Sequence, residues 1–111
     1  MSTLNFNNTK KQYLTVVLPD EKNTTLFISM PTKALVEELI SIRDGFADTD
    51  NDSLDQGLCD LYDLVARVMS RNKGGVKITR ERLEKCLDFE DIIIFFNSYM
   101  AFVNSAKNSK N

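Results

Sequence analysis

Four aspartates are crowded into the stretch ADTDNDSLDQ, whose residue types most closely resemble a metal site. A calcium loop of the helix-loop-helix kind needs oxygen ligands at its first, third and fifth positions, glycine at the sixth and glutamate at the twelfth. Counted from Asp48, the ligands would be Asp48, Asp50 and Asp52, but the sixth position is Ser53 and the twelfth is Cys59. Because no register supplies the missing residues, we interpret the stretch as a polar hinge between two helices.

Nucleophilic catalysis is difficult to build because the chain contains no histidine, so a serine or cysteine nucleophile would have no imidazole base. Cys59 and Cys86 lie among apolar neighbours, which predicts reduced core residues rather than a disulfide. The glycine-containing segment NKGGVK lacks the signature of a phosphate-binding loop. We therefore expect no enzyme, no cofactor and no bound metal.

The basic residues gather in one segment, RNKGGVKITRER. It contains Arg71, Lys73, Lys77, Arg80 and Arg82. Two glutamates interrupt or adjoin this cluster, and no aromatic residue is interleaved for base stacking. The net charge of -2 provides no surplus to neutralise phosphates, so a solvated turn is favoured over a nucleic-acid contact.

The chain has no features of a membrane protein or of a secretory leader. No run approaches the ~20 apolar residues of a membrane helix. The segment MSTLNFNNTKKQY also lacks the apolar centre of a signal peptide. These features predict an intracellular protein.

The elements that must position any site begin with a predicted β-hairpin over residues 12–30. Its two runs are rich in β-branched and aromatic residues, and each ends at a proline. In the second run, Leu26, Ile28 and Met30 alternate with other residues, which is typical of a half-buried strand. A lone hairpin is marginally stable in water, so we expect helices to cover its apolar face.

Apolar stripes with helical spacing predict helices at about residues 32–45, 54–72 and 89–105. A short helix capped by Thr79 is predicted before the last of these, with Leu83 and Leu87 pointing inward. Asp52 or Ser53 is the expected N-cap of the second helix, and Asp88 that of the last.

The expected fold is mainly α (α+β), with the N-terminal hairpin followed by about four helices packed as a small helical domain. Residues 1–111 are long enough for one domain with a modest core. The helical part is predicted at residues 32–104, and residues 1–11 and 105–111 are expected to be disordered tails.

The last predicted helix is apolar nearly all round. One stripe contains Phe89, Ile92, Ile93, Phe96, Met100 and Val103, and a second face contains Ile94, Phe95, Tyr99 and Phe102. A domain of this size rarely encloses its last helix completely. The helix is therefore either central in the monomer core or an interface that uses the face of Tyr99 and Phe102.

Three segments, ISMPTKALVEEL, LYDLVARVMSRN and ITRERLEKCLDFEDIIIFFNSYMAFV, resemble the tail assembly chaperones of long-tailed (siphovirus-type) bacteriophages and prophages. The resemblance covers about residues 12–104. It implies a protein of the host bacterial cytoplasm that coats the tape measure protein and recruits the major tail protein. It also implies self-association into a homo-oligomer. The charge balance and the lack of a long apolar run predict no nucleic-acid partner and no membrane partner.

The residues expected at the protein interface are Phe95, Tyr99, Phe102 and Ile94, with Ile28 and Met30 as a second candidate. Packing of the hairpin on the helices is the favoured interpretation of Ile28 and Met30. Two alternative functions remain open. One is a small phage or mobile-element regulator that binds DNA or a host factor, and the other is a structural connector or terminator of the tail.

The hinge interpretation predicts that calcium does not bind the aspartate stretch tightly. Titration calorimetry is expected to show no binding stronger than roughly millimolar, the weak end of the range for extracellular calcium modules. Tighter binding would contradict the hinge interpretation.

Overall fold

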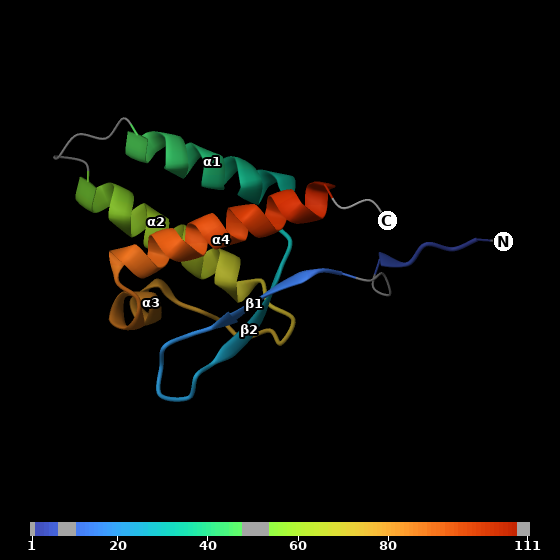
Figure 1. Cartoon of the computed structure of the whole chain (residues 1–111), viewed down its shortest axis with the longest axis horizontal. Coiled ribbons are helices and arrows are strands. Elements are labelled where there is room, and N and C mark those ends of the chain that lie inside the picture. The colour runs from blue at the N-terminus through green and yellow to red at the C-terminus, as the bar shows by residue number, and fades with distance from the viewer. Residues whose placement is uncertain (1, 7–10, 48–53, 109–111) are drawn as a thin grey trace.

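The computed structural model describes residues 2–6, 11–47 and 54–108. Its elements are an antiparallel hairpin followed by four helices, so the predicted fold class is confirmed (Figure 1). Residues 48–53, which hold three of the aspartates and both predicted caps of the second helix, lie outside the described residues.

The hairpin consists of β1 (Tyr13–Val17) and β2 (Thr25–Ser29), which pair so that Leu14 lies opposite Ile28. Ile28 is fully buried, whereas the adjacent Phe27 is 44% exposed. The predicted two-residue alternation of the second strand is therefore confirmed, and one face of the sheet contributes to the core.

The turn of the hairpin is organised by Asp20. Its carboxylate accepts hydrogen bonds from the backbone N–H of Thr24 (2.9 Å) and from the hydroxyl of the same residue (2.7 Å). Arg82 of the third helix donates a further bond of 2.9 Å to Asp20. An aspartate that bonds its own turn favours the reversal of the chain, and the arginine fastens this turn to the helices.

The far edge of β2 is covered by the chain that follows the second helix. The N–H of Ser29 donates to the carbonyl of Arg71 (2.7 Å), and the N–H of Lys73 donates to the carbonyl of Phe27 (2.9 Å). The side-chain amide of Asn72 stabilises this segment. It donates hydrogen bonds to the carbonyls of Met69 and Val76 and accepts one from the N–H of Val76. Thus β2 has neighbours on both edges, and β1 is an edge strand.

The two long helices α1 (Lys33–Ala47) and α2 (Leu54–Ser70) follow the hairpin. Leu35 and Leu39 are the buried residues of the α1 stripe. The buried residues of α2 are Leu61, Leu64, Val65, Ala66, Val68 and Met69. Helices α1, α3 and α4 and strand β2 all pack on α2, which is therefore the centre of the domain.

The short helix α3 (Arg80–Cys86) begins where the sequence predicts. The hydroxyl of Thr79 accepts a 3.1 Å hydrogen bond from the N–H of Arg82, which is the expected N-cap. Leu83 and Leu87 are both buried, as predicted.

The last helix, α4 (Phe89–Asn108), starts with a reciprocal cap. Asp88 accepts from the N–H of Asp91 (2.8 Å), and Asp91 accepts from the N–H of Asp88 (3.1 Å). The helix continues to Asn108, so the prediction of a disordered tail from residue 105 was wrong for residues 105–108. No proline or glycine follows Phe89, and hence no residue strongly opposes this extension.

The buried face of α4 combines members of both predicted faces. Its buried residues are Ile92, Phe95, Phe96 and Tyr99. The last three follow Ile92 by three, four and seven residues, so all four side chains lie on one continuous face of the helix. This face packs on α2 and the hairpin. Phe89 and Ile93, which belong to the first stripe, are 43% and 37% exposed, so this stripe is not buried as a unit.

Tyr99 joins α4 to the hairpin. Its side chain is fully buried, and its hydroxyl donates a 2.9 Å hydrogen bond to the carbonyl of Ser29. Burial raises the pKa of Tyr99 to about 12 because the phenolate would lose its hydration.

Replacement of Tyr99 by Phe is expected to lower the free energy of unfolding by about 1 kcal/mol near neutral pH, since one buried hydrogen bond is lost. The raised folded-state pKa stabilises the native protein below the unfolded value near 10, and this contribution is lost as pH rises toward 12. The stability difference between the two proteins should therefore shrink over this range in urea titrations. A constant difference would contradict the assigned environment of Tyr99.

Candidate functional site

The structure separates the six predicted interface residues. Phe95, Tyr99 and Ile28 are buried in the core, at 8%, 0% and 0% exposure, and Phe102 and Met30 are half-buried. Ile94 is 59% exposed and is the one large surface side chain among the six. The packing interpretation of Ile28 is therefore confirmed.

Tyr99, which was considered together with Phe102 for an interface face of α4, is buried in the monomer, whereas Phe102 is half-buried. The ring of Tyr99 stacks on Phe95 at 5.7 Å between centroids and lies 6.0 Å from Phe102. These contacts, together with the bond to Ser29, place the Tyr99 ring inside the monomer. Two other surfaces, one on each side of α4, remain apolar and accessible.

The first surface is a groove between β1 and α4, hereafter the β1–α4 groove, with a volume of about 450 Å³. Figure 1 shows β1 passing along one side of α4. Consecutive residues of the hairpin from Leu14 to Pro19 line one wall. The other wall and the floor contain Asp91, Ile94, Phe95, Ser98, Leu87 and Met69.

The backbone of β1 adds hydrogen-bonding capacity to this groove. Phe27 and Ser29 direct their backbone groups toward residues 71–73. In an antiparallel ladder, a residue opposite such a position directs its own N–H and C=O away from its partner strand. Thr15, opposite Phe27, therefore presents both groups at the outer edge, and no other part of the described chain supplies them with a hydrogen-bond partner.

The second surface is a smaller groove between α1 and α4, hereafter the α1–α4 groove, with a volume of about 130 Å³. It is lined by Ile42, Arg43, Leu61, Ile93, Phe96 and Asn97. Phe89 lies one helical turn before Ile93, so the two exposed side chains share a face of α4. The sequence signal for this surface was present in the all-round apolar pattern, but the pattern did not identify its exposed members.

The basic cluster makes structural contacts. Arg71 donates to the carbonyl of Met30 (2.9 Å), and the ammonium of Lys73 lies 5.7 Å from the centroid of the Tyr13 ring. Arg82 bonds Asp20, as described above.

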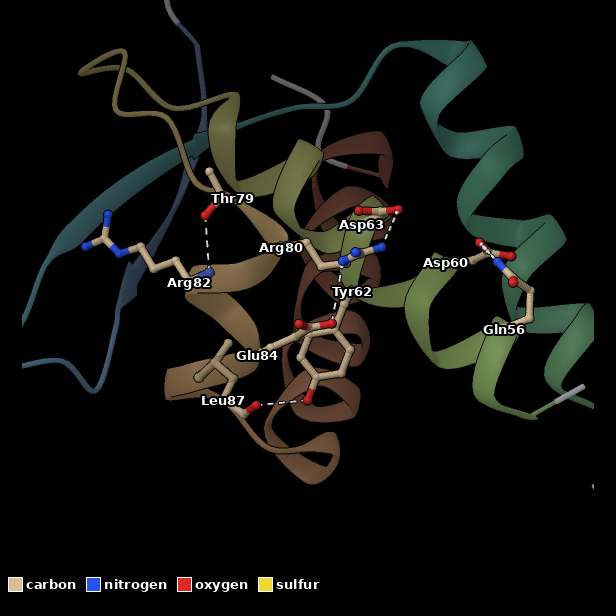
Figure 2. A network of polar contacts seen from close by, with 9 residues as sticks. All are labelled: Gln56, Asp60, Tyr62, Asp63, Thr79, Arg80, Arg82, Glu84 and Leu87. Carbon is tan, nitrogen blue, oxygen red and sulfur yellow. Dashed lines mark hydrogen bonds and ion pairs between the residues drawn. The ribbon is translucent and has the colours of Figure 1, made fainter.

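Arg80 also has partners within the fold. Figure 2 shows its guanidinium between the carboxylates of Asp63 (3.4 Å) and Glu84 (3.5 Å). Nearby, the hydroxyl of Tyr62 donates to the carbonyl of Leu87 (2.9 Å), which joins α2 to the end of α3. Four of the five basic side chains thus contact other groups of the same chain. Less positive charge is therefore available to bind a phosphate backbone than the sequence indicates.

An acidic hollow lies between α1 and α2, lined by Glu38, Ser41, Ile42, Asp60, Asp63 and Arg67. Arg67 forms a two-pronged pair with Glu38 at 2.9 and 3.2 Å, and these bonds lower the pKa of Glu38. Gln56 donates to Asp60 at 3.0 Å (Figure 2). Over the described ranges, no three acidic or cysteine side chains are grouped to hold a metal ion.

The two cysteines are free, but they are half-buried rather than fully buried as predicted. Burial raises the pKa of Cys86, which reduces its thiolate fraction and hence its reactivity.

Within the described part of the chain, no helix has the length and apolar character needed to cross a bilayer. Comparison with protein-family models, curated proteins and solved structures gives no match. The two grooves beside α4 are therefore the surfaces from which a function can be argued.

Alanine substitutions test the assignment of the α4 faces. Ile92→Ala is expected to cost about 2–5 kcal/mol of unfolding free energy because it leaves a cavity in the core. Ile94→Ala should change the same quantity by less than about 0.5 kcal/mol, since the side chain is 59% exposed. Chemical denaturation measures both, and equal losses would contradict the assignment.

Proposed function

We propose that this chain is a phage tail assembly chaperone that holds a helical segment of the tape measure protein and helps to recruit tail tube subunits. The resemblance of residues 12–104 to that family supports the proposal. It acts, on this proposal, in the cytoplasm of the host bacterium before tails polymerise.

The observation that carries the proposal is the α1–α4 groove. Helices α1 and α4 both pack on α2, and the apolar side chains of Ile42, Leu61 and Ile93 line the space between them. A two-helix groove of this kind suits an amphipathic helix, which places apolar side chains at helical spacing into it. The exposed Phe89 extends the apolar surface by one turn.

The size and rim of the groove favour a protein partner over a small molecule. Its volume of about 130 Å³ is below the roughly 300–1,000 Å³ that is typical of small-molecule pockets. Arg43 and Asn97 stand beside the apolar lining and provide polar groups at the margin. An apolar centre with a polar rim is typical of protein interfaces.

The DNA-binding alternative has weaker support. Its candidate contacts are the basic residues before and within α3, and most of these are engaged with Asp20, Asp63, Glu84 or backbone carbonyls. Phosphate contacts would have to compete with these pairs.

Co-expression with the tape measure protein tests the proposal. On this proposal, the tape measure protein would be a very long helical protein encoded immediately downstream of this chain's gene, which inspection of the gene neighbourhood would identify. The unaltered chain should keep it soluble and co-purify with it. Ile93→Asp should weaken this binding by about tenfold or more, because burying a charge in the groove replaces a favourable apolar contact.

Val76→Asp is the matched control, because Val76 is also 37% exposed but lies in the turn before α3. It should leave binding unchanged. Equal binding by all three proteins would remove the α1–α4 groove from the proposal. Failure of the unaltered chain to solubilise or bind the tape measure protein would refute the chaperone role itself.

A further inference from the structure

The β1–α4 groove combines two features that a single extended segment would satisfy together. The outer backbone groups of Thr15 can accept and donate strand hydrogen bonds, as described above. The groove beside them is lined mainly by apolar side chains, including Ile94 and Phe95 of α4. A peptide added as a strand to β1 would pair its backbone with this edge and place alternate side chains into the groove.

The same chain carries a segment with the matching pattern. Residues 2–6, hereafter the arm, read STLNF and are exposed throughout. Leu4 and Phe6 are both 70% exposed, the largest exposures among the big apolar side chains of the described residues. In this structure Phe6 lies in a 3-10 turn, so the arm has to straighten at Phe6 before it can pair as a strand. Because successive side chains of a strand point to opposite faces, Leu4 and Phe6 would then lie on one face of the arm.

The arm also matches the groove in length and charge. It contains as many residues as β1, which has five. Residues 2–6 carry no charged side chain, so entry into the groove would bury no charge. Thr3 and Asn5 would point to the opposite, solvent-facing side, beside Thr15 and Val17.

The position of the arm indicates whether it occupies the groove of its own chain or that of a second copy. In Figure 1 the N-terminal residues extend beyond the start of β1 and away from the helices and the hairpin. An arm held in that direction reaches a neighbouring molecule without reversing its path. Exchange of a terminal segment between identical chains is a low-cost route to association, because donor and acceptor surfaces are present on every copy.

We infer that the arm of a second copy adds to the edge of β1 as a third strand, with Leu4 and Phe6 in the β1–α4 groove. This inference concerns the association of copies, and it stands on observations separate from the α1–α4 groove. It assigns Ile94 and Ser98 to contact with the incoming arm.

Disulfide trapping between differently substituted copies tests the arrangement. Leu4→Cys is placed in one protein and Ser98→Cys in another, both with Cys59→Ser and Cys86→Ser, and unfolding curves confirm that each full-length protein is folded. Mild oxidation of the mixture should give a covalent heterodimer. Pairing Leu4→Cys with Glu37→Cys, an exposed position on α1, is the control for random collision.

No enrichment of the Ser98 heterodimer over the Glu37 control would overturn the inference. A single chain that carries both Leu4→Cys and Ser98→Cys tests whether the arm occupies the groove of its own chain or that of a second copy. Exclusive formation of an intrachain bridge in dilute solution would show that the arm folds onto its own groove, which would overturn the assignment to a second copy.

The association constant supplies an independent readout. Leu4→Ser with Phe6→Ser should weaken self-association at least about tenfold in sedimentation or light scattering, since two apolar contacts are lost. Thr3→Ser with Asn5→Ser, on the other face of the arm, is the matched control and should have little effect. Equal association of the two variants, or a monomeric parent protein, would contradict the inference.

These outcomes are distinguishable from those for the chaperone role. Ile94→Asp should weaken self-association while binding of an isolated tape measure segment is retained, and Ile93→Asp should have the reverse effect. Loss of arm exchange with intact tape measure binding would therefore reject this inference alone.

Discussion

The burial of α2 is the constraint on which the rest of the structure depends. Its apolar residues contact α1, α3, α4 and β2, so this one helix provides the packing surface for nearly every other element. A small domain has limited surface with which to cover such a helix. Because α1 and α4 each pack on α2, an apolar groove remains between them. In the same packing, the outer edge of β1 lies beside α4 and is not covered by it, so a second groove remains between the two elements.

Polar contacts then determine how the hairpin is placed on this helical layer. Tyr99 bonds Ser29 from α4, Arg71 bonds Met30, and Arg82 bonds Asp20 at the turn. Each bond joins residues far apart in the sequence, and each uses a group that the sequence alone presented as available for function. The pKa of Asp20 is held well below its usual value, chiefly by its bonds to Thr24 and then by Arg82, which is consistent with a structural carboxylate.

The two grooves beside α4 offer different recognition chemistry. The α1–α4 groove has helical walls and no free backbone edge, so it favours side chains projecting from a partner helix. The β1–α4 groove has an unpaired strand edge and therefore favours an extended segment. Ile93 and Ile94 are adjacent in the chain but belong to different grooves, because successive residues of a helix point about 100° apart. On the proposed chaperone role, coating a long helix requires both a partner surface and a means of self-association, and the two grooves would meet these two requirements separately.

The sequence by itself determined the local elements of this protein. The alternation in the hairpin, the leucine stripes of α1 and α2, and the caps at Thr79 and Asp88 are set by contacts between residues close in the chain, so spacing is sufficient to predict them. The exposure of Ile93 and Ile94 and the burial of Tyr99 were decided only by the tertiary structure. A helix that is apolar nearly all round carries no periodic signal to say which face meets the core, and that choice depends on where α2 and the hairpin place their own apolar surfaces.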